Sequence, residues 1–308
     1  MNTLDIKNGP QGGSRIVLGC MRMPALSVQE AAALLRTAAE EGINFFDHAT
    51  IYGDGEAETR FGAAFRAAGL KREDVTVQSK CGIHPERGEF DWTCRDILES
   101  VDGSLRRLRT EYLDVLLLHR PDLLFEPEEV AEAFERLERS GKVRFFGVSN
   151  VTPGQLRLLK KYVRQPLVIN QLQFSLDQSQ LVDGGLYLNN PTTERAADRD
   201  RGVLDYCRLH DITVQAWSPL QSGASQGSFV DHPDFPALNH ELGQLGEQYG
   251  VSKSAVAIAW ILRHPARMQA VVGTMNPRHL REICAAAAVE LRHREWYRLY
   301  LASGKFLP

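Results

Sequence analysis

Short apolar runs rich in β-branched residues alternate with longer amphipathic stretches along the chain, and this alternation constrains the fold more than any other feature. The run Val115–Leu118 is apolar throughout, which is typical of parallel strands covered on both faces. Eight runs are present: Arg15–Gly19, Asn44–Asp47, Val75–Lys80, Tyr112–His119, Phe145–Ser149, Val168–Gln171, Thr213–Trp217 and Gln269–Gly273.

The stretches between these runs have helical spacing. Gly42 and Gly141 each follow such a stretch, and glycine there can take the left-handed conformation that ends many helices. In both places the next strand is expected to begin within a few residues. The clearest apolar stripes are Ile97, Val101, Leu105 and Leu108, and Val130, Phe134 and Leu137.

Eight β/α units in 308 residues, with no Pro/Ser-rich linker between them, predict an α/β fold. A single (β/α)8 TIM barrel domain spanning residues 1–308 fits this pattern better than a doubly wound sheet. The chain also lacks a G-x-G-x-x-G fingerprint, which disfavours a Rossmann dehydrogenase.

Two polar segments, Leu176–Arg201 and Gln221–Ala237, are longer than ordinary connections between elements. Both follow predicted strands, which would place them over the C-terminal mouth of a barrel, where active sites lie. We expect them to help enclose a substrate. A surface insertion without such a role is the alternative.

Charge and hydropathy narrow the classes of partner. With 36 basic and 39 acidic residues the formal net charge is -3, so a basic field for nucleic acid is lacking and a small molecule is the expected partner. Met1–Ser14 has no apolar signal core, and no run approaches the ~20 residues of a membrane span. We expect a cytoplasmic monomer that binds neither nucleic acid nor membrane.

Metal binding is not indicated by the sequence. His48, His84 and His119 show no paired ligand spacing, and Lys80 would be a poor neighbour for a cation, so a metal-dependent barrel hydrolase is a less favoured alternative. The cysteines form no C-x-x-C pair, and we expect free, buried thiols, although the first two could face a pocket. They are Cys20, Cys81, Cys94, Cys207 and Cys284.

Polar residues end four of the predicted strands, at the rim where a barrel meets its ligand. Asp47 ends the second strand and Tyr52 follows it, Lys80 ends the third, and His119 ends the fourth. The fifth ends in Ser149-Asn150. Their joint placement predicts a catalytic site, although each alone has a structural explanation.

The four residues Asp47, Tyr52, Lys80 and His119 have a shared chemical logic. A tyrosine with a pKa near ~10 is a weak acid, and the Lys80 ammonium is expected to lower that pKa. Asp47 would neutralise Lys80 in a dry site. His119 could then hydrogen-bond a carbonyl oxygen and stabilise the negative charge that develops on it.

These segments resemble the aldo-keto reductase family. The stretch 42–53, GINFFDHATIYG, is similar to the family signature around its catalytic Asp and Tyr, and Ser79-Lys80 and 117–122, LLHRPD, are similar to the lysine and histidine segments. The similarity continues in order through 147–150, 170–171 and 217–220 to 273–274. Residues 204–207 and 216–219 resemble most the bacterial YdhF-like oxidoreductases of the family.

The resemblance implies NADP(H) as cofactor. Side chains at the fifth and sixth strand ends would grip the carboxamide, the seventh would offer a tryptophan to stack on the nicotinamide, and the start of a helix near Pro277 would bind the 2'-phosphate. Family members often have Lys at Gly273 and Arg at His279, so this chain departs from the pattern. The implied cofactor-binding residues are Gly19, Met21, Arg22, Asp47, Ser149, Asn150, Gln171, Trp217, Ser218, Pro219, Leu220, Gly273, Thr274, Asn276, Arg278, His279 and Glu282.

The resemblance therefore predicts an NADPH-dependent enzyme that reduces an aldehyde or ketone to an alcohol, with Tyr52 as the general acid. A redox-sensing binding module of the same fold, which binds NADP(H) with little turnover, is the alternative. An intact Asp, Tyr, Lys and His set favours the enzyme. The sequence of the loops that would determine substrate choice does not predict which substrate is bound.

Overall fold

All eight predicted runs form strands in the computed structural model, which describes residues 3–308 except 189, 191, 198–200 and 223–226. The strands are parallel and close into a barrel in chain order, with β12 pairing back to β3. Their bounds are β3 (Ile16–Gly19), β4 (Phe45–Asp47), β5 (Thr76–Cys81), β8 (Leu113–Leu118), β9 (Val143–Ser149), β10 (Leu167–Gln173), β11 (Thr213–Trp217) and β12 (Gln269–Val272). The predicted TIM barrel is thus confirmed.

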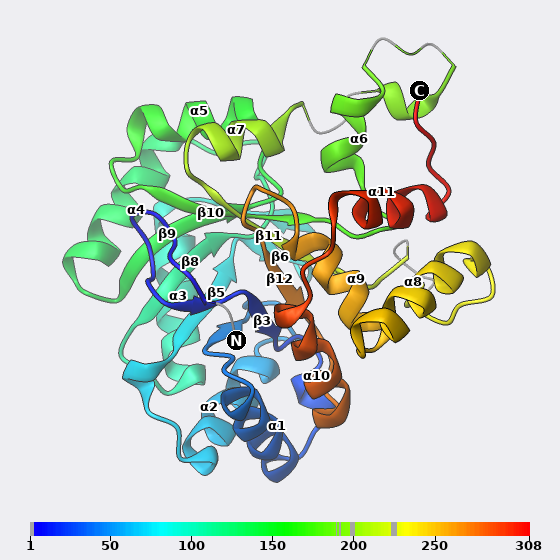
Figure 1. Ribbon diagram of the computed structural model, residues 1–308. Helices are drawn as coiled ribbons and strands as arrows, with labels where there is room; N and C mark the ends of the chain where they lie inside the picture. Colours follow the sequence, from blue (N-terminus) through cyan, green and yellow to red (C-terminus); the bar gives the residue numbers. More distant parts are fainter. Residues whose placement is uncertain (1–2, 189, 191, 198–200, 223–226) are drawn as a thin grey trace.

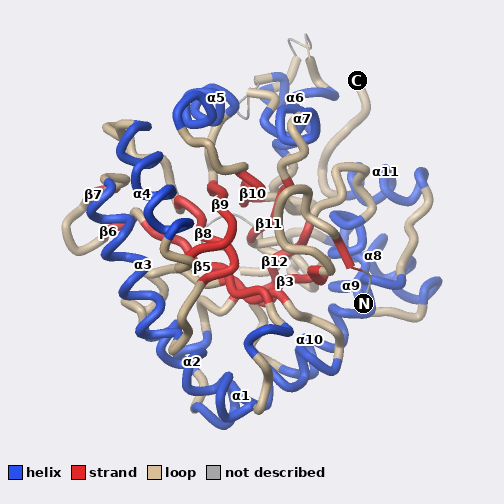
Figure 2. Tube along the Cα trace, turned by 90° about the vertical axis from the view of Figure 1, so that its left-hand side faces the viewer, coloured by secondary structure: helices blue, strands red, loops and turns tan. Residues whose placement is uncertain are grey.

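Helices follow the strands and surround the barrel (Figures 1 and 2). Short hairpins, β1 (Thr3–Leu4) with β2 (Gly13–Ser14) and β6 (Ile83–His84) with β7 (Glu89–Phe90), lie outside it. The helices are α1 (Val28–Glu40), α2 (Glu56–Ala68), α3 (Cys94–Leu108), α4 (Pro127–Arg139), α5 (Pro153–Tyr162), α6 (Gln180–Leu186), α7 (Val203–Leu209), α8 (Pro236–Tyr249), α9 (Lys253–Leu262), α10 (Pro277–Cys284) and α11 (His293–Ala302).

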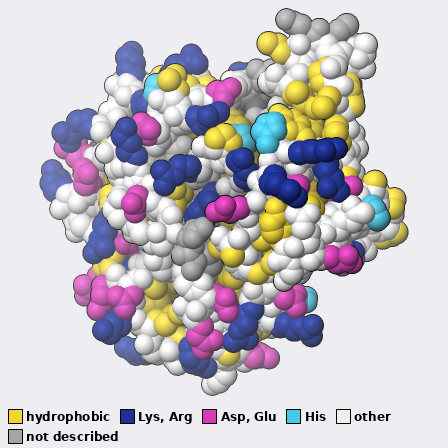
Figure 3. Space-filling model, in the orientation of Figure 1, with side chains coloured by type: hydrophobic (Ala, Val, Ile, Leu, Met, Phe, Trp, Pro, Cys, Tyr) yellow, Lys and Arg dark blue, Asp and Glu magenta, His cyan; other side chains and the backbone are white. Residues whose placement is uncertain are grey.

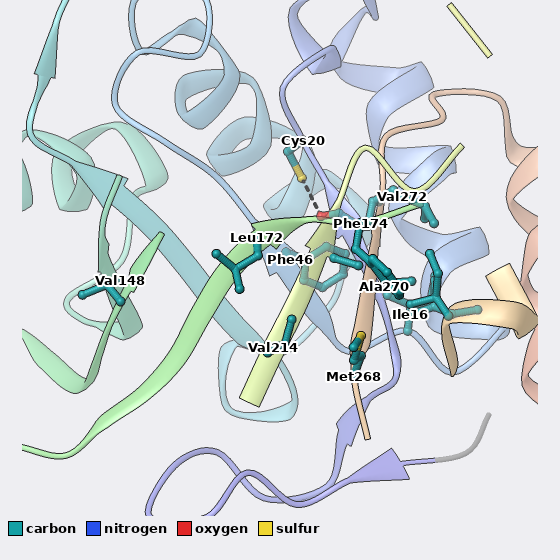
Figure 4. Packing of buried hydrophobic residues seen from close by; sticks show 14 of the residues in the cluster. Ile16, Cys20, Phe46, Val148, Leu172, Phe174, Val214, Met268, Ala270 and Val272 are labelled. Atoms are coloured by element: carbon teal, nitrogen blue, oxygen red, sulfur yellow. Dashed lines mark hydrogen bonds between the residues drawn. The ribbon is translucent and has the colours of Figure 1, made fainter. Parts of the chain in front are cut away.

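The continuous apolar character of the strands follows from two separate layers of packing. On β8, Val115 and Leu117 belong to the cluster inside the barrel, whereas Leu116 and Leu118 belong to the larger cluster between strands and helices. Ile6, from the N-terminal segment, is fully buried in the inner cluster. Part of the larger cluster is shown in Figure 4. Because both faces of each strand are covered, neither face needs polar residues.

The local signals for helix ends are also confirmed. Gly42 and Gly141 follow α1 and α4 with φ of 78° and 72°, in the left-handed region. Ser27 and Glu30 form a reciprocal capping box at the start of α1, which was not among the predicted signals. Both predicted apolar stripes are buried, one on α3 and the other on α4.

A close contact between α2 and α3 gives a prediction about stability. A Cβ added at Gly62 would lie 2.6 Å from the carbonyl oxygen of Arg107 and 2.8 Å from the backbone of Leu108. Gly62→Ala is therefore expected to destabilise the protein by about 1–3 kcal/mol, since backbone cannot move aside cheaply. Gly154→Ala is the matched control, because a Cβ there meets nothing within 4 Å. Urea unfolding midpoints compare the two, and an unchanged midpoint in Gly62→Ala would contradict this packing.

The two long segments differ in what they contact. Residues of Gln221–Ala237 line the large cavity described below, as expected for a segment that encloses a substrate. No described residue of Leu176–Arg201 does so. That segment packs instead against the C-terminal tail, where Tyr300 donates to Asp183 at 2.7 Å and Tyr187 donates to the carbonyl of Phe306 at 2.7 Å. Its expected substrate-enclosing role finds no support in these contacts.

All five cysteines are free and buried. Neither Cys20 nor Cys81 lines the large cavity, and Cys20 lies within the packed layer, with its Sγ 3.5 Å from the carbonyl oxygen of Leu18 (Figure 4). They therefore act as small buried hydrophobes, as expected.

No described helix is long and apolar enough to cross a membrane. Acidic and basic side chains are both spread over the face shown in Figure 3. A face with mixed charge exerts little long-range steering on charged partners. The monomeric state and the cytoplasmic location stay predictions.

Candidate active site

A cavity of about 990 Å³ opens at the C-terminal end of the barrel, where strand ends and the following loops converge. Its position is the one where TIM-barrel active sites lie. Most of the residues singled out from the sequence line it: Gly19, Met21, Arg22, Asp47, Tyr52, His119, Ser149, Asn150, Gln171, Trp217, Ser218, Pro219, Leu220, Gly273, Thr274, His279 and Glu282.

Lys80 lies behind the cavity wall and holds Asp47 and Tyr52 together. Its Nζ donates to Asp47 Oδ2 at 2.7 Å, to the Tyr52 hydroxyl at 3.1 Å and to the His48 carbonyl at 2.8 Å. β4 and β5 are neighbours in the barrel, which places the ends of both strands side by side. The Lys80 side chain is 0% exposed, so these three acceptors satisfy the donors of its ammonium.

The pKa of Tyr52 differs from the sequence-based expectation. Burial raises the pKa of the Tyr52 phenol above its ordinary value, and the Lys80 ammonium offsets only part of that rise. The prediction that Lys80 lowers the pKa of Tyr52 overall is therefore wrong for the protein without ligand. The loss of water around the phenolate raises this pKa more than one nearby cation lowers it. A raised pKa keeps the phenol protonated at neutral pH, which is the state a proton donor needs.

The ammonium of Lys80 stays charged despite its burial. Burial alone would lower its pKa, but the adjoining Asp47 and Tyr52 raise the pKa above the ordinary value of a lysine. The site thus contains a buried Lys80–Asp47 ion pair beside the neutral phenol of Tyr52.

His119 lies across from Tyr52, with the ring centroids 5.9 Å apart and the rings nearly perpendicular. Burial, together with Lys80 and Arg120 nearby, holds the pKa of His119 well below its ordinary value. The ring is therefore a neutral imidazole at pH 7. A neutral imidazole can donate one hydrogen bond to a carbonyl oxygen without adding a positive charge to the site.

A row of buried glutamine amides fixes the orientation of Asp47, and sequence reasoning missed most of it. Gln78 and Gln171 donate to Asp47 Oδ1 at 2.6 and 3.0 Å, and both also donate to Gln215 Oε1. Gln215 in turn donates to Gln269. The available signal was glutamine inside otherwise apolar strands, where a polar group needs a partner. Gln171 lines the cavity, as expected, but its amide nitrogen is already used by Asp47 and Gln215.

The Trp217 indole is held in a fixed orientation. Its Nε1 donates to Asn150 Oδ1 at 3.1 Å, and Asn150 Nδ2 donates to Ser149 Oγ at 2.8 Å. Asn150 and Ser218 both have positive φ, 60° and 52°, so these strand ends turn sharply at the cavity. The result is a flat aromatic wall whose polar edge is already satisfied.

Another part of the cavity wall lies at the start of α10. Asn276 caps this helix by accepting from the backbone N–H of Arg278 and His279. Neither Asn276 nor Arg278 lines the cavity, since the Arg278 side chain is 85% exposed and pairs with Glu282 at 3.0 Å. Thr274 and His279 do line it. The structure thus brings together part of the set expected to bind a phosphate.

A second helix start, at α9, also faces the cavity, and sequence reasoning missed it. Ser252 caps α9 by accepting from Ala255, and Lys253 pairs with Asp231 at 2.5 Å. A serine before an apolar helical run was the available signal. The lining residues outside both the predicted site residues and the predicted enclosing segment Gln221–Ala237 are Ile51, Ile83, Arg120, Ser252, Lys253, Ser254, Val271, Val272 and Ile283.

His48 lies directly after Asp47 and is fully buried against Phe61, with ring centroids 4.5 Å apart. Neither ring nitrogen has a hydrogen-bond partner within the described chain, and burial lowers the pKa of His48 to about 3. It is therefore a neutral packing residue. Across the described residues, no group of three or more His, Cys, Asp or Glu is placed to hold a metal ion.

Comparison with known proteins identifies the family of this chain. The model of the aldo/keto reductase family matches residues 15–300. The chain belongs to the aldo/keto reductase family. Two bacterial relatives of this aldo/keto reductase are oxidoreductase YcsN of Bacillus subtilis, 35% identical over 94% of each chain, and oxidoreductase YdhF of Escherichia coli, 33% identical over 96% of this chain and 95% of that protein.

The solved structures also include members of the family. An aldo-keto reductase from Klebsiella pneumoniae in complex with NADPH has a TM-score of 0.75 and 27% identity, covering 97% of this chain and 94% of that one. The resemblance to YdhF-like oxidoreductases predicted from the sequence is confirmed. This aldo/keto reductase is accordingly an oxidoreductase.

Proposed function

We propose that this aldo/keto reductase uses NADPH to reduce an aldehyde or ketone to an alcohol, with Tyr52 as the general acid. One observation carries the proposal: Tyr52 lines the large cavity, and its hydroxyl accepts a hydrogen bond from Lys80, which is buried and paired with Asp47. The Klebsiella pneumoniae relative that was solved with NADPH supports this choice of cofactor.

The residues that line the cavity fit a dinucleotide. Its volume, about 990 Å³, is at the upper end of ordinary ligand pockets. Trp217 offers a flat surface for an aromatic ring near Tyr52, and Arg22 lines the cavity beside Gly273 with no ion pair among the described residues. Thr274 and the start of α10 favour an anion there. When bound, NADPH supplies a hydride to the carbonyl carbon.

The chain's own residues supply the proton and stabilise charge on the oxygen. Tyr52 donates its hydroxyl proton to the carbonyl oxygen as negative charge develops there, and Lys80 stabilises the phenolate that remains. Asp47 keeps Lys80 charged in a buried site, and the row of glutamines keeps Asp47 in place. His119 orients the carbonyl oxygen by a neutral hydrogen bond.

A panel of aldehydes, ketones and quinones, followed by the absorbance of NADPH, tests the proposed function. We expect oxidation of NADPH that depends on the carbonyl compound and yields one alcohol per NADPH. Tight NADPH binding with no turnover on any member of the panel would favour the redox-sensing module instead.

A preference for NADPH over NADH is expected from the phosphate end of the cavity. Arg22, Thr274 and His279 lie where a 2'-phosphate can accept charge-assisted hydrogen bonds, which contribute about 1.5–3 kcal/mol each. Fluorescence titration should therefore give a Kd for NADPH at least about tenfold below that for NADH. Equal dissociation constants would contradict this assignment and implicate Gly273, where the family resemblance leads us to expect lysine.

Stacking on Trp217 predicts a specific fluorescence change. NADPH is expected to quench part of the intrinsic fluorescence of the wild type, and that part should be absent in Trp217→Phe. The chain has four tryptophans, so the difference between the two proteins isolates one of them. Trp260→Phe is a control, since that ring is fully buried and stacked on Trp296 away from the cavity. Equal quenching in wild type and Trp217→Phe would place the nicotinamide elsewhere.

A further inference from the structure

The acidic side chains that line the cavity all have cationic partners already. Within the described residues they are Asp47, Asp231 and Glu282, and they pair with Lys80, Lys253 and Arg278 respectively. Residues 223–226, outside the description, have the sequence GASQ and contain no acid. Among the described residues that line the cavity, no carboxylate is therefore free to neutralise a further cation.

Two arginines face this cavity without a carboxylate. Arg22 lies beside Gly273, at the end assigned to the cofactor phosphates. Arg120 also lines the cavity and directly follows His119 in the chain. Its side chain makes no hydrogen bond or ion pair with any described residue, and its guanidinium carbon lies 5.7 Å from the centre of the Trp217 ring.

We propose that Arg120 binds an anionic group, a carboxylate or a phosphate, on the carbonyl substrate, so that the enzyme prefers carbonyl compounds with a negative charge close to the reacting carbon. This inference rests on the proposed function and adds the substrate class to it. Because neighbouring Cα atoms are only about 3.8 Å apart, His119 and Arg120 can contact the carbonyl oxygen and the anion of one small molecule.

The preference for an anion follows from the charge and the hydrogen-bond donors of the Arg120 guanidinium once ligands fill the cavity. The Arg120 side chain is exposed, and substrate and cofactor would displace water from it. An arginine stays charged in proteins even where desolvation lowers its pKa, as it does here. Its five N–H donors then need acceptors, and the Trp217 ring satisfies none of them directly. A carboxylate or phosphate fits the planar fork with two parallel hydrogen bonds. A neutral hydrocarbon chain would leave the charge unpaired.

Matched pairs of aldehydes test the proposal. 4-Oxobutanoate is compared with its methyl ester, and glyceraldehyde 3-phosphate with glyceraldehyde, in the wild type and in Arg120→Met. We expect the wild type to favour the charged member of at least one pair by tenfold or more in kcat/KM, mainly through KM. Arg120→Met should lose at least tenfold of that preference, and Arg120→Lys should restore part of it. Preference in one pair alone identifies which anion is recognised.

Arg95→Met is the control for net charge. Its side chain is 85% exposed on α3 and does not line the cavity, so it should leave the preference intact. Equal preference in wild type and Arg120→Met, or a wild-type preference for the neutral members, including the polyhydroxy aldehyde glyceraldehyde, would overturn the inference and leave the proposed function standing.

A binding measurement separates the inference from the proposed function. Succinate is titrated against wild type and Arg120→Met with NADPH present, and butane-1,4-diol serves as the uncharged probe. Succinate binding that Arg120→Met weakens tenfold would support the anion site even if no aldehyde were reduced. Failure of succinate to bind the wild type, in an enzyme that does reduce aldehydes, would overturn the anion site alone.

Discussion

Replacing Tyr52 by phenylalanine is expected to lower kcat/KM for an active aldehyde by at least 10² while leaving the Kd of NADPH nearly unchanged. The change removes only the hydroxyl, which accepts a 3.1 Å hydrogen bond from Lys80 at the cavity wall. General acid catalysis commonly contributes ~10² to 10⁴ in rate. The cofactor contacts assigned here come mainly from the ends of β9 to β12, whereas Tyr52 follows β4.

The comparison requires both constants in both proteins. Leu220→Ala is a suitable control, because Leu220 lines the cavity but cannot donate a proton to the substrate. This substitution should change mainly the KM for the aldehyde. A Tyr52→Phe enzyme with more than about a tenth of wild-type kcat/KM would have lost less than ~1.4 kcal/mol of transition-state stabilisation, and Tyr52 would then not be the acid.

The buried ion pair gives the second large effect, on stability. Lys80→Met is expected to destabilise the protein by about 3–5 kcal/mol, because it leaves Asp47, 2% exposed, as an uncompensated buried charge. Activity should fall as well, since the Tyr52 phenolate would lose its neighbouring cation and the pKa of Tyr52 would rise further. Urea unfolding midpoints measure the first effect, and kcat/KM the second.

Two further variants separate charge from packing. The double variant Asp47→Asn, Lys80→Met removes both charges and should recover most of the lost stability, but not the activity. Lys142→Met breaks a pair with Asp102 whose side chains are 41% and 43% exposed, and exposed pairs contribute about 1 kcal/mol or less. If Lys80→Met lowers the stability no more than Lys142→Met does, the buried Lys80–Asp47 pair does not stabilise the protein as proposed.

The fold was predictable because its signals are local and repeated. Each strand has two buried faces and therefore reads as an apolar run, as Val115–Leu118 does, and helix ends such as Gly141 have positive φ. The role of Leu176–Arg201 was not predictable. Its contacts with Tyr300 and Phe306 join residues more than 100 positions apart, and no local pattern encodes them.

The candidate site was predictable where a polar side chain ends an apolar strand, as at Asp47 and Lys80. The direction in which the pKa of Tyr52 shifts was not predictable, because it depends on how much water the folded chain removes from the phenol. Gln78, Gln215 and Gln269 were missed because each is unremarkable alone and gains meaning only when the closed barrel aligns their amides. Arg120 was seen only as part of the histidine segment.

Transfer of deuterium from NADPH labelled at C4 of the nicotinamide tests the central claim most directly. We predict that the alcohol carries deuterium on its former carbonyl carbon, from only one of the two C4 positions, because Trp217 and its bond to Asn150 fix which face of the ring meets the substrate. In D2O with unlabelled NADPH, that carbon should remain free of deuterium, since the solvent-exchangeable proton of Tyr52 goes to oxygen. An alcohol with no label from NADPH, or with solvent deuterium on carbon, would contradict hydride transfer assisted by Tyr52.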